Sequence, residues 1–166
     1  MSMHTQAQRA PLGLYTAEER KRRDATIWTP VQGVLAPVQF VVFLVSLGLV
    51  VRYLATGEGY VIATWSIVVK TGVLYVIMVT GAIWEKVVFG QYLLAPAFFW
   101  EDVFSFLVIG LHTAYLWALF SGALAPEPLM LLALAAYAAY VINAGQFVLK
   151  LRAARLQATT LSEAAT

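Results

Sequence analysis

Few residues of this 166-residue chain could do chemistry, and most of them stand in or beside long apolar segments. The ionisable candidates are Lys70, Glu85, Lys86, Glu101, Asp102 and His112. An ionisable side chain inside a membrane costs about 2.5–3.5 kcal/mol on insertion scales, so each one needs a partner or a task. Neighbouring carboxyl groups in a water-poor setting can hold a proton at neutral pH, which suits general acid–base chemistry on an apolar substrate.

Helical spacing groups several of these residues. Glu101, Ser105, Val108 and His112 fall on one face of a helix at 100° per residue. His112 then lies about 16 Å deeper than Glu101, at 1.5 Å per residue. Lys70 should sit at a similar depth to His112, and the sequence leaves open whether the two face each other. Near one end of their helices we expect a polar cluster of Gln32, Glu85, Glu101, Asp102 and Gln146.

Each candidate also has a structural interpretation. Acids at a helix N-terminus complement the helix dipole, so Glu101 and Asp102 could be there for that reason alone. Lys70 could extend to the interface or pair structurally, and a lone buried histidine such as His112 is more often a packing residue than a ligand. The other polar candidates could be solvated or could bridge helices: Glu85, Lys86, Asn143 and Gln146.

Four segments long enough to cross a membrane must position these residues. Charged residues make up only 12% of the chain, against about 25% in an ordinary soluble domain. Uncharged runs cover 27–51, 103–126 and 128–149, and a fourth run, 59–84, is interrupted only by Lys70. Each exceeds the roughly 20 residues that a hydrocarbon core of about 30 Å requires. The backbone must satisfy its own hydrogen bonds in lipid, so we expect helices.

The predicted fold is therefore an all-α polytopic membrane protein with four transmembrane helices. We expect these helices at approximately 27–54, 60–86, 99–121 and 127–151. The basic residues that flank them are Arg9, Arg20, Lys21, Arg22 and Arg23 before the first helix and Lys150, Arg152 and Arg155 after the last. This positive-inside bias puts both termini in the cytoplasm, as an even number of crossings requires. The chain has no cysteine, which excludes disulfides, thiolate catalysis and thiolate metal sites.

The transmembrane domain, 27–151, would then lie between a tail with a short surface helix, 1–26, and a tail at 152–166. Thr16 to Glu19 fits a capping box, which predicts where the surface helix begins. Pro37 should kink the first transmembrane helix and open a place where Gln32 or Gln39 could face inward.

The segment 87–98, between the second and third predicted helices, is apolar and aromatic but too short to cross a membrane. Gly90 and Pro96 would interrupt a helix there. The segment should lie in the interface or dip back into the bundle. It would serve either as an aromatic anchor for two helix ends or as a wall of a site for a flat apolar ligand.

Longer stretches resemble a known enzyme family. The most specific blocks read WEKVVFGQYL and APAFFWEDVFS, within a likeness that extends from about Leu14 to Leu156. They resemble the vinyl hydratase of bacteriochlorophyll synthesis, also called chlorophyllide a 3¹-hydratase or 2-vinyl bacteriochlorophyllide hydratase. The resemblance implies hydration of the C3 vinyl group of chlorophyllide a, or of a related vinyl chlorin, to a 1-hydroxyethyl group. It implies no cofactor beyond the magnesium that the substrate carries.

The resemblance also suggests roles and partners. Glu101 or Asp102 would donate the proton, and Glu85 would activate water. His112 could ligate the substrate magnesium or hydrogen-bond a ring substituent, and Lys70 could pair with the substrate propionate. The other expected substrate-binding residues are Gln32, Trp84, Phe99, Trp100, Asn143 and Gln146.

The location implied is a bacterial inner membrane, cytoplasmic or intracytoplasmic and photosynthetic, with lipid around a multi-pass protein. A homo-oligomer and an association with other pigment-synthesis enzymes both stay open. Nucleic acid is not an expected partner, because no aromatic stacking platform accompanies the basic N-terminus.

Three other functions compete with the hydratase. A pigment-binding or assembly subunit would use the same aromatic pocket and His112 without transforming the pigment. A haem-based electron carrier usually needs paired histidines, and the chain has only His4 and His112. A proton-coupled transporter would have few ionisable stations along its helices.

Overall fold

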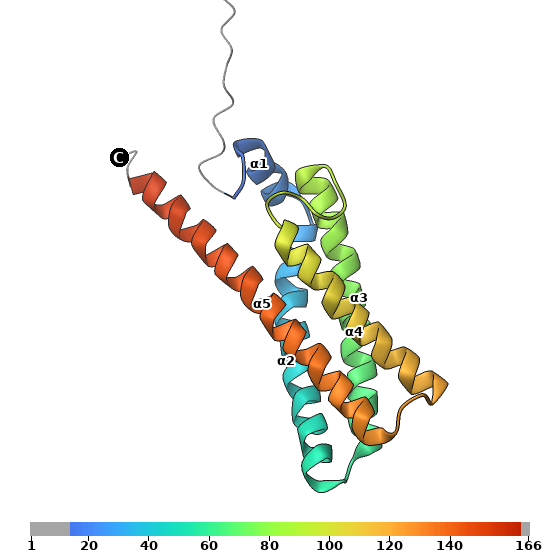
Figure 1. Cartoon of the computed structure of the whole chain (residues 1–166). Helices are drawn as coiled ribbons and strands as arrows, with labels where there is room; N and C mark the ends of the chain where they lie inside the picture. Colours follow the sequence, from blue (N-terminus) through green and yellow to red (C-terminus); the bar gives the residue numbers. More distant parts are fainter. Residues whose placement is uncertain (1–13, 164–166) are drawn as a thin grey trace, which may run out of the picture.

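The computed structural model describes residues 14–163, which form five helices and no strand. The helices are α1 (Ala17–Ala25), α2 (Trp28–Thr56), α3 (Tyr60–Phe89), α4 (Phe99–Ser121) and α5 (Pro126–Glu163) (Figure 1). In α2, α3, α4 and α5 the apolar stretches are long enough to cross a membrane. The prediction of an all-α protein with four membrane-spanning helices is confirmed.

Helix α1 is short, polar and capped as the sequence predicts. The Thr16 hydroxyl accepts the Glu19 backbone N–H at 3.2 Å, and the Glu19 carboxylate accepts the Thr16 N–H at 2.7 Å. Tyr15, just before the helix, stacks on Phe89 at the last residue of α3, with ring centroids 5.8 Å apart. These contacts place α1 beside the end of α3. We call this end of the molecule, which also holds the start of α4, the α1 end.

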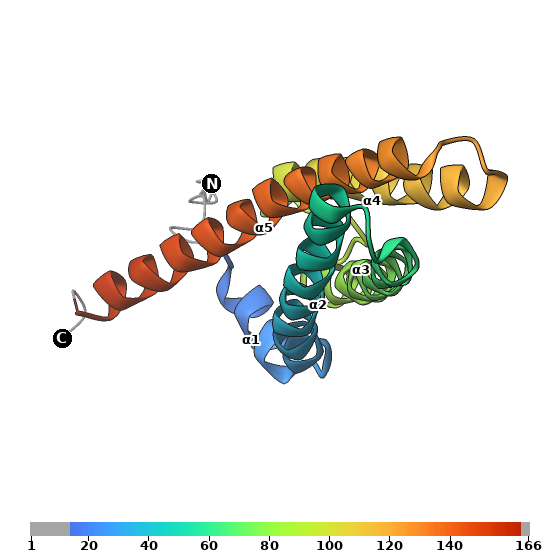
Figure 2. The same cartoon turned by 90° about the horizontal axis from the view of Figure 1, so that it is seen from below.

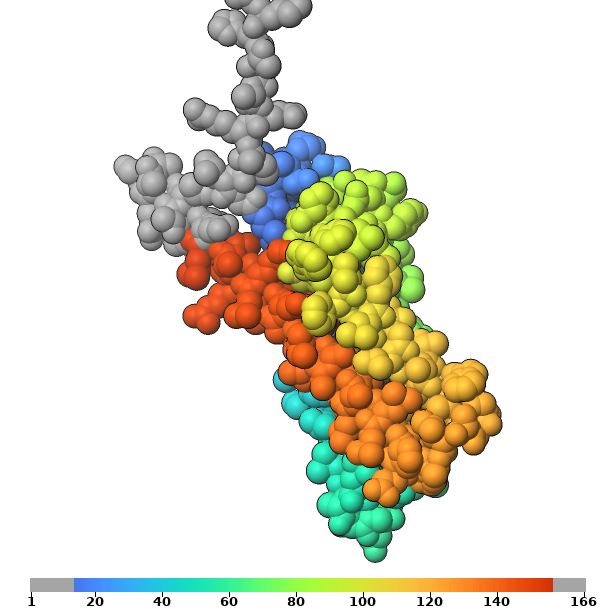
Figure 3. All heavy atoms as spheres, viewed as in Figure 1, coloured from blue at the N-terminus to red at the C-terminus, as the bar shows by residue number. Residues whose placement is uncertain are grey.

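The four long helices form two antiparallel hairpins. A turn at Gly57 and Gly59 joins α2 to α3, and one at Gly122 joins α4 to α5; these glycines have positive φ angles, which glycine adopts without strain. Figure 1 shows α5 crossing in front of α2 where the two hairpins meet, and in Figure 2, a view from below, the two helices overlap at the same place. In Figure 3 α4 and α5 run side by side along one face of the molecule.

The core lies where the hairpins meet. Phe43 of α2 packs on Tyr137 and Tyr140 of α5, with ring centroids 5.4 and 5.0 Å apart. The Tyr137 hydroxyl also shares a hydrogen bond with Ser46. Among the fully or nearly fully buried apolar residues around them are Val50, Ala63, Ile67, Leu74, Val108, Tyr115, Leu129, Met130 and Ala133.

The helix bounds differ from the expected ranges by more than two residues at two ends. α3 continues to Phe89, so the connection that follows is shorter than the predicted segment 87–98. α5 continues to Glu163, through most of the stretch expected as a tail, and its last part extends away from the other helices (Figures 1 and 2). After Gly145, α5 contains no glycine or proline that would end the helix. The alanine, leucine and arginine residues there favour helix, so the helix continues.

Helix α2 runs without a break through Pro37. Gln39 is buried and Gln32 is half-buried, so both turn toward the interior as expected. The Gln32 amide donates to the Thr80 hydroxyl of α3 at 2.7 Å, and the Trp84 indole donates to Thr29 at 3.0 Å. These bonds pin the start of α2 to the end of α3.

Candidate functional site

Two carboxyl groups meet inside the α1 end of the molecule. Glu85 comes from the last turns of α3 and Asp102 from the first turn of α4, and their side chains are only 5% and 3% exposed. The two side chains are close enough to interact electrostatically. We call them the carboxyl pair. Two negative charges this close in a water-poor setting repel each other, which favours a proton on one of the two groups. Such a pair can supply both a proton donor and a proton acceptor.

The connection between α3 and α4, residues 90–98, covers the carboxyl pair. The Leu94 backbone N–H donates to an Asp102 carboxyl oxygen at 2.7 Å, and the Ala95 N–H donates to a Glu85 carboxyl oxygen at 3.3 Å. Two successive N–H groups thus point at the two acids, as in the backbone nests that bind anions. We call residues 90–98 the covering loop.

Leu94 has an unusual backbone conformation. It is the one non-glycine residue between 14 and 163 with a positive φ, 60°. The left-handed region costs an L-residue roughly 1–2 kcal/mol, so the surrounding structure must hold Leu94 in place. The hydrogen bond from Leu94 to Asp102 and the complete burial of Ala95 do so. The covering loop and the carboxyl pair therefore stabilise each other.

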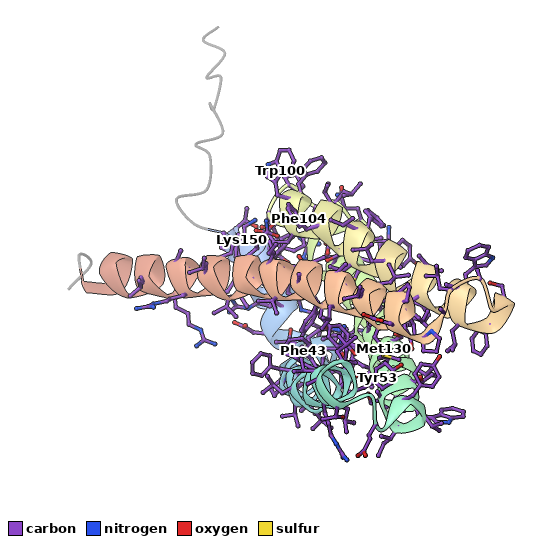
Figure 4. All side chains as sticks on the ribbon, turned by 60° about the horizontal axis from the view of Figure 1, so that its bottom comes forward. Phe43, Tyr53, Trp100, Phe104, Met130 and Lys150 are labelled. Carbon is purple, nitrogen blue, oxygen red and sulfur yellow. The ribbon has the colours of Figure 1, made fainter. Side chains whose placement is uncertain are left out.

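Glu101 has a different partner from its neighbour Asp102. Its carboxylate accepts a hydrogen bond from the Lys150 amine of α5 at 2.6 Å, and the lysine also lies over the Phe98 ring, 5.2 Å from its centroid. Figure 4 shows Lys150 of α5 beside the start of α4. Adjacent acids on one helix point about 100° apart, which explains the separate partners. Glu101 clamps α4 to α5, and Asp102 joins Glu85.

A cluster of aromatic rings lies at the same end of the molecule as the carboxyl pair, and Phe98 of the covering loop belongs to it. Trp84, Phe89 and Phe98 contact one another with ring centroids 5.7–5.9 Å apart, and Phe98 stacks on Phe147 of α5. Trp84 immediately precedes Glu85, so this expected substrate-binding residue lies at the site. The other two aromatic candidates, Phe99 and Trp100, are exposed on the outside of α4; Trp100 is 67% exposed and points away from the bundle (Figure 4).

Lys70 and His112 face each other deep in the core. The Lys70 amine lies 2.6 Å from His112 Nε2, and His112 Nδ1 lies 2.7 Å from the Val108 carbonyl oxygen. The carbonyl can only accept, so Nδ1 carries the proton and Nε2 accepts from the lysine. Lys70 also lies over the Tyr140 ring, 4.2 Å from its centroid. Neither ring nitrogen is free to reach a magnesium ion in this arrangement.

The lysine–histidine pair also lies far from the carboxyl pair. His112 is ten residues along α4 from Asp102, which is about 15 Å along the helix axis. Both Lys70 and His112 are completely buried, so a substrate propionate at the surface does not meet the amine. The expected roles of Lys70 and His112 in substrate binding stay predictions that this geometry does not support.

The amide side chains form a third group, between the acids and the lysine–histidine pair. The Asn143 amide of α5 donates to the Ser105 hydroxyl of α4 at 2.8 Å. Four buried amide atoms have no hydrogen-bond partner among the described residues: Gln39 Nε2, Gln39 Oε1, Asn143 Oδ1 and Gln146 Oε1. Asn143 and Gln146 were expected at the site from the sequence.

Sequence reasoning missed two features of this site. Gln39 was expected to face inward but not to belong to the site; the available signal was a glutamine on the buried face of a helix that is otherwise apolar. The N–H groups of Leu94 and Ala95 carry no side-chain signal, because a backbone conformation positions them.

Two apolar grooves lie between α2 and α3. One, of about 530 Å³, is lined near the start of α2 by Ile27, Pro30, Val31, Val34 and Leu35 and by Val76 and Thr80 of α3. The other, of about 340 Å³, includes Val41, Val45, Trp65 and Val69. Neither Glu85 nor Asp102 lines these grooves. A substrate must therefore displace part of the cover to reach the carboxyl pair.

Comparisons with known proteins agree on one family. The model of the 2-vinyl bacteriochlorophyllide hydratase family matches residues 15–153. A protein of Cereibacter sphaeroides with the name 2-vinyl bacteriochlorophyllide hydratase is 74% identical over 144 residues, which cover 86% of this chain and 89% of that protein. A Rhodobacter capsulatus protein with the same name is 73% identical over 148 residues, 89% of this chain and 85% of that protein. No solved structure matches. This chain belongs to the 2-vinyl bacteriochlorophyllide hydratase family.

Proposed function

We propose that this chain adds water across the vinyl group of a bacteriochlorophyllide or chlorophyllide, with Glu85 and Asp102 as the acid–base pair. The reaction class follows from membership of the hydratase family. The observation that carries the residue assignment is the carboxyl pair itself, two neighbouring buried acids that accept hydrogen bonds from successive N–H groups of the covering loop. Glu101 is less suited to proton donation than Asp102, since its carboxylate is held by Lys150.

The steps balance without an oxidant or a reductant. The protonated acid of the pair gives its proton to the terminal vinyl carbon, and the π electrons of the double bond form the new C–H bond. The inner carbon becomes a cation that the conjugated macrocycle delocalises. A water oxygen attacks that carbon, and the other carboxylate takes the proton that the water releases. The product is a 1-hydroxyethyl group, and the pair again holds one proton. Hydration therefore needs no redox cofactor.

The surroundings favour this chemistry for electrostatic reasons. Charges in a water-poor site interact more strongly than in bulk water, so a carboxylate beside the developing cation stabilises it substantially. The two N–H groups of the covering loop hold the acids in place through the reaction. The aromatic rings of Trp84, Phe89 and Phe98 offer flat apolar surface to a macrocycle.

Entry of the substrate requires the covering loop to move. The loop spans the ends of α3 and α4, and Leu94 in it has a strained backbone. Opening would release that strain and expose the carboxyl pair to a pigment in the membrane. The basic residues of α1, among them Arg20 and Arg22, support an orientation in which the α1 end faces the cytoplasm.

The test is an assay of membranes that contain this protein. Incubation with a 2-vinyl bacteriochlorophyllide or chlorophyllide a should produce a pigment heavier by one water, about 18 daltons, with a blue-shifted red absorption band. Glu85→Gln and Asp102→Asn should each slow hydration about 100-fold or more, the usual contribution of general acid–base catalysis. Glu58→Gln, on an exposed turn at the opposite end, is the matched control and should keep full activity.

The outcomes separate the alternatives. Pigment that binds without gaining mass would make this chain a pigment-binding subunit instead. Full activity in both Glu85→Gln and Asp102→Asn would leave the reaction standing and remove the carboxyl pair from it.

A further inference from the structure

The interior of the molecule contains amide groups that nothing in the described chain satisfies. Gln39 is only 2% exposed, and both of its amide atoms lack a partner; Asn143 is 8% exposed and its carbonyl oxygen lacks one. Leaving a buried polar group without a hydrogen bond costs roughly 1–3 kcal/mol. Such groups in native proteins generally have a bound partner. Several orphan atoms in one region indicate a shared ligand.

The contacts of neighbouring residues place Gln39 between the two hairpins. It lies one turn along α2 from Phe43, toward the α1 end, and the Phe43 ring packs against Tyr140 of α5. Asn143 lies one turn from Tyr140 in the same direction. Gln39 and Asn143 therefore project into the same part of the interface between α2 and α5.

This amide group lies directly beneath the carboxyl pair. The Asn143 amide donates to Ser105, and the Ser105 hydroxyl donates to the carbonyl oxygen of Glu101. Ser105 is three residues from Asp102, about one helical turn or 5 Å along α4. The Asn143 amide is thus about one helical turn from Asp102 along α4, and His112 lies seven residues beyond Ser105 on the same helix.

The chemistry of the four orphan atoms fits water. Gln39 offers one N–H₂ donor and one carbonyl acceptor, and Asn143 and Gln146 each offer a carbonyl acceptor. A buried water typically makes about three hydrogen bonds to buried polar groups. A water molecule both donates and accepts, so it can satisfy this mixed set, whereas an anion would be repelled by three carbonyl oxygens.

We propose that Gln39, Asn143 and Gln146 form a binding site for the water that this enzyme adds to its substrate. This proposal rests on the proposed hydratase function. The site keeps the second reactant close to the carboxyl pair in a region that the membrane otherwise keeps dry. Gln146 and Lys150 follow Asn143 on the same face of α5, toward the α1 end, so a polar seam connects the site with the solvent at that end.

The first test replaces the amide by an apolar group of similar shape. Gln39→Met should lower kcat at least tenfold and leave KM for the pigment nearly unchanged, because the water and not the pigment loses its site. The melting temperature should stay constant or rise, since an unsatisfied buried amide is removed. Gln39→Glu, which keeps a carbonyl oxygen at the same place, should retain more activity than Gln39→Met.

A comparison variant identifies a merely structural role. Gln32→Met removes an amide that has a partner, Thr80, and should lower the melting temperature. If Gln39→Met lowers the melting temperature as much as Gln32→Met and leaves kcat intact, Gln39 is a structural residue and the proposal is wrong.

The second test does not depend on activity. The chain has no cysteine, so Gln39→Cys, Asn143→Cys and Val108→Cys each introduce a single thiol. A small membrane-permeant methanethiosulfonate reagent reacts with the thiolate, which forms only where water reaches. Labelling at positions 39 and 143 should be at least tenfold faster than at Val108, a buried residue among apolar neighbours.

Equal labelling rates at the three positions would refute the water site even in a fully active enzyme. If the unaltered chain does not hydrate a vinyl pigment, the proposed function is wrong. The labelling rates at positions 39 and 143 then decide by themselves whether water reaches the site.

Discussion

Adjacent residues of this protein have different tasks because their partners differ. Glu101 and Asp102 follow each other in the chain, yet one meets Lys150 of α5 and the other meets Glu85 of α3. The first contact holds two helices together. The second brings two buried acids together, which is the basis of the proposed catalysis. The identity of the partner, rather than the residue type, separates the structural carboxylate from the reactive one.

The ion pair between Lys150 and Glu101 should contribute measurably to stability. Their side chains are 28% and 9% exposed, so Lys150→Met leaves a mostly buried carboxylate without its cation. We expect the free energy of unfolding to fall by about 2 kcal/mol, less than for a fully buried pair because water partly screens the lysine. Denaturant unfolding in detergent measures this loss. The double variant Glu101→Gln/Lys150→Met should recover most of the lost free energy of unfolding. If it recovers none, the ion pair does not contribute to stability.

The engagement of both His112 nitrogens predicts that pigment binding does not need this residue. In an inactive Glu85→Gln background, His112→Phe should change the dissociation constant of a vinyl chlorin less than threefold. Removing the magnesium from the pigment should have an equally small effect in both proteins. An absorbance titration measures the constants. A tenfold weaker affinity that appears only with the magnesium pigment would restore His112 as an axial ligand.

At the scale of elements, the covering loop connects the fold with the site. Residues 90–98 join α3 to α4, cover the carboxyl pair and donate two backbone hydrogen bonds to it. The loop begins at Gly90, whose positive φ ends α3, and it ends where Phe98 packs into the aromatic cluster. The same nine residues thus set the distance between the two acids and control access to them.

Substitutions at Leu94 should separate the backbone hydrogen bond from the backbone strain. Leu94→Pro removes the N–H and cannot adopt a φ of 60°, so hydration should slow at least tenfold and the loop should become protease-sensitive. Leu94→Gly keeps the N–H and relieves strain, which should favour the closed loop by up to about 1 kcal/mol. Hydrogen exchange of residues 90–98 reports the difference.

A matched control for Leu94→Gly is Leu93→Gly, at a neighbouring residue without a positive φ. There glycine only adds flexibility, so exchange in the loop should become faster. Faster exchange in Leu94→Gly as well would show that the left-handed backbone stores no strain.

At the scale of the whole molecule, two hairpins meet along a core that changes character with depth. The core toward the opposite end is mostly apolar, the middle holds the lysine–histidine pair, the amides follow, and the α1 end holds the acids. The long outer surfaces of α2, α3 and α4 are apolar and exposed, as lipid-facing surfaces are. The lysine–histidine pair, the amides and the acids therefore form a polar column inside the protein that reaches the α1 end.

The position of this column predicts the orientation of the protein in the membrane. Single cysteines at Glu58 and Ala123, on the two turns of the opposite end, should react with an impermeant thiol reagent added outside intact cells. A cysteine at Ala17, in α1, should react only after the membrane is permeabilised. The basic residues of α1 favour this orientation. Labelling of Ala17→Cys in intact cells would invert it and put the carboxyl pair on the outer side.

Composition and apolar run length were enough to determine the fold class and the number of spans. A segment of some 20 apolar residues in lipid has few options besides a helix, so local sequence decides the outcome. The capping box at Thr16 is equally local, and the family blocks around Glu85 and Asp102 identify the reaction class. These properties follow from residues that are neighbours in the chain.

Only the tertiary structure decided which polar groups meet. Spacing put Glu101 and Asp102 on one helix turn, but their different partners depend on where α3 and α5 pack around α4. The same holds for Lys70 on His112 and for the unpartnered amide of Gln39. Helix periodicity gives the direction of a side chain around its own axis. The rotation and crossing of the neighbouring helices, which sequence spacing does not encode, determine what that side chain contacts.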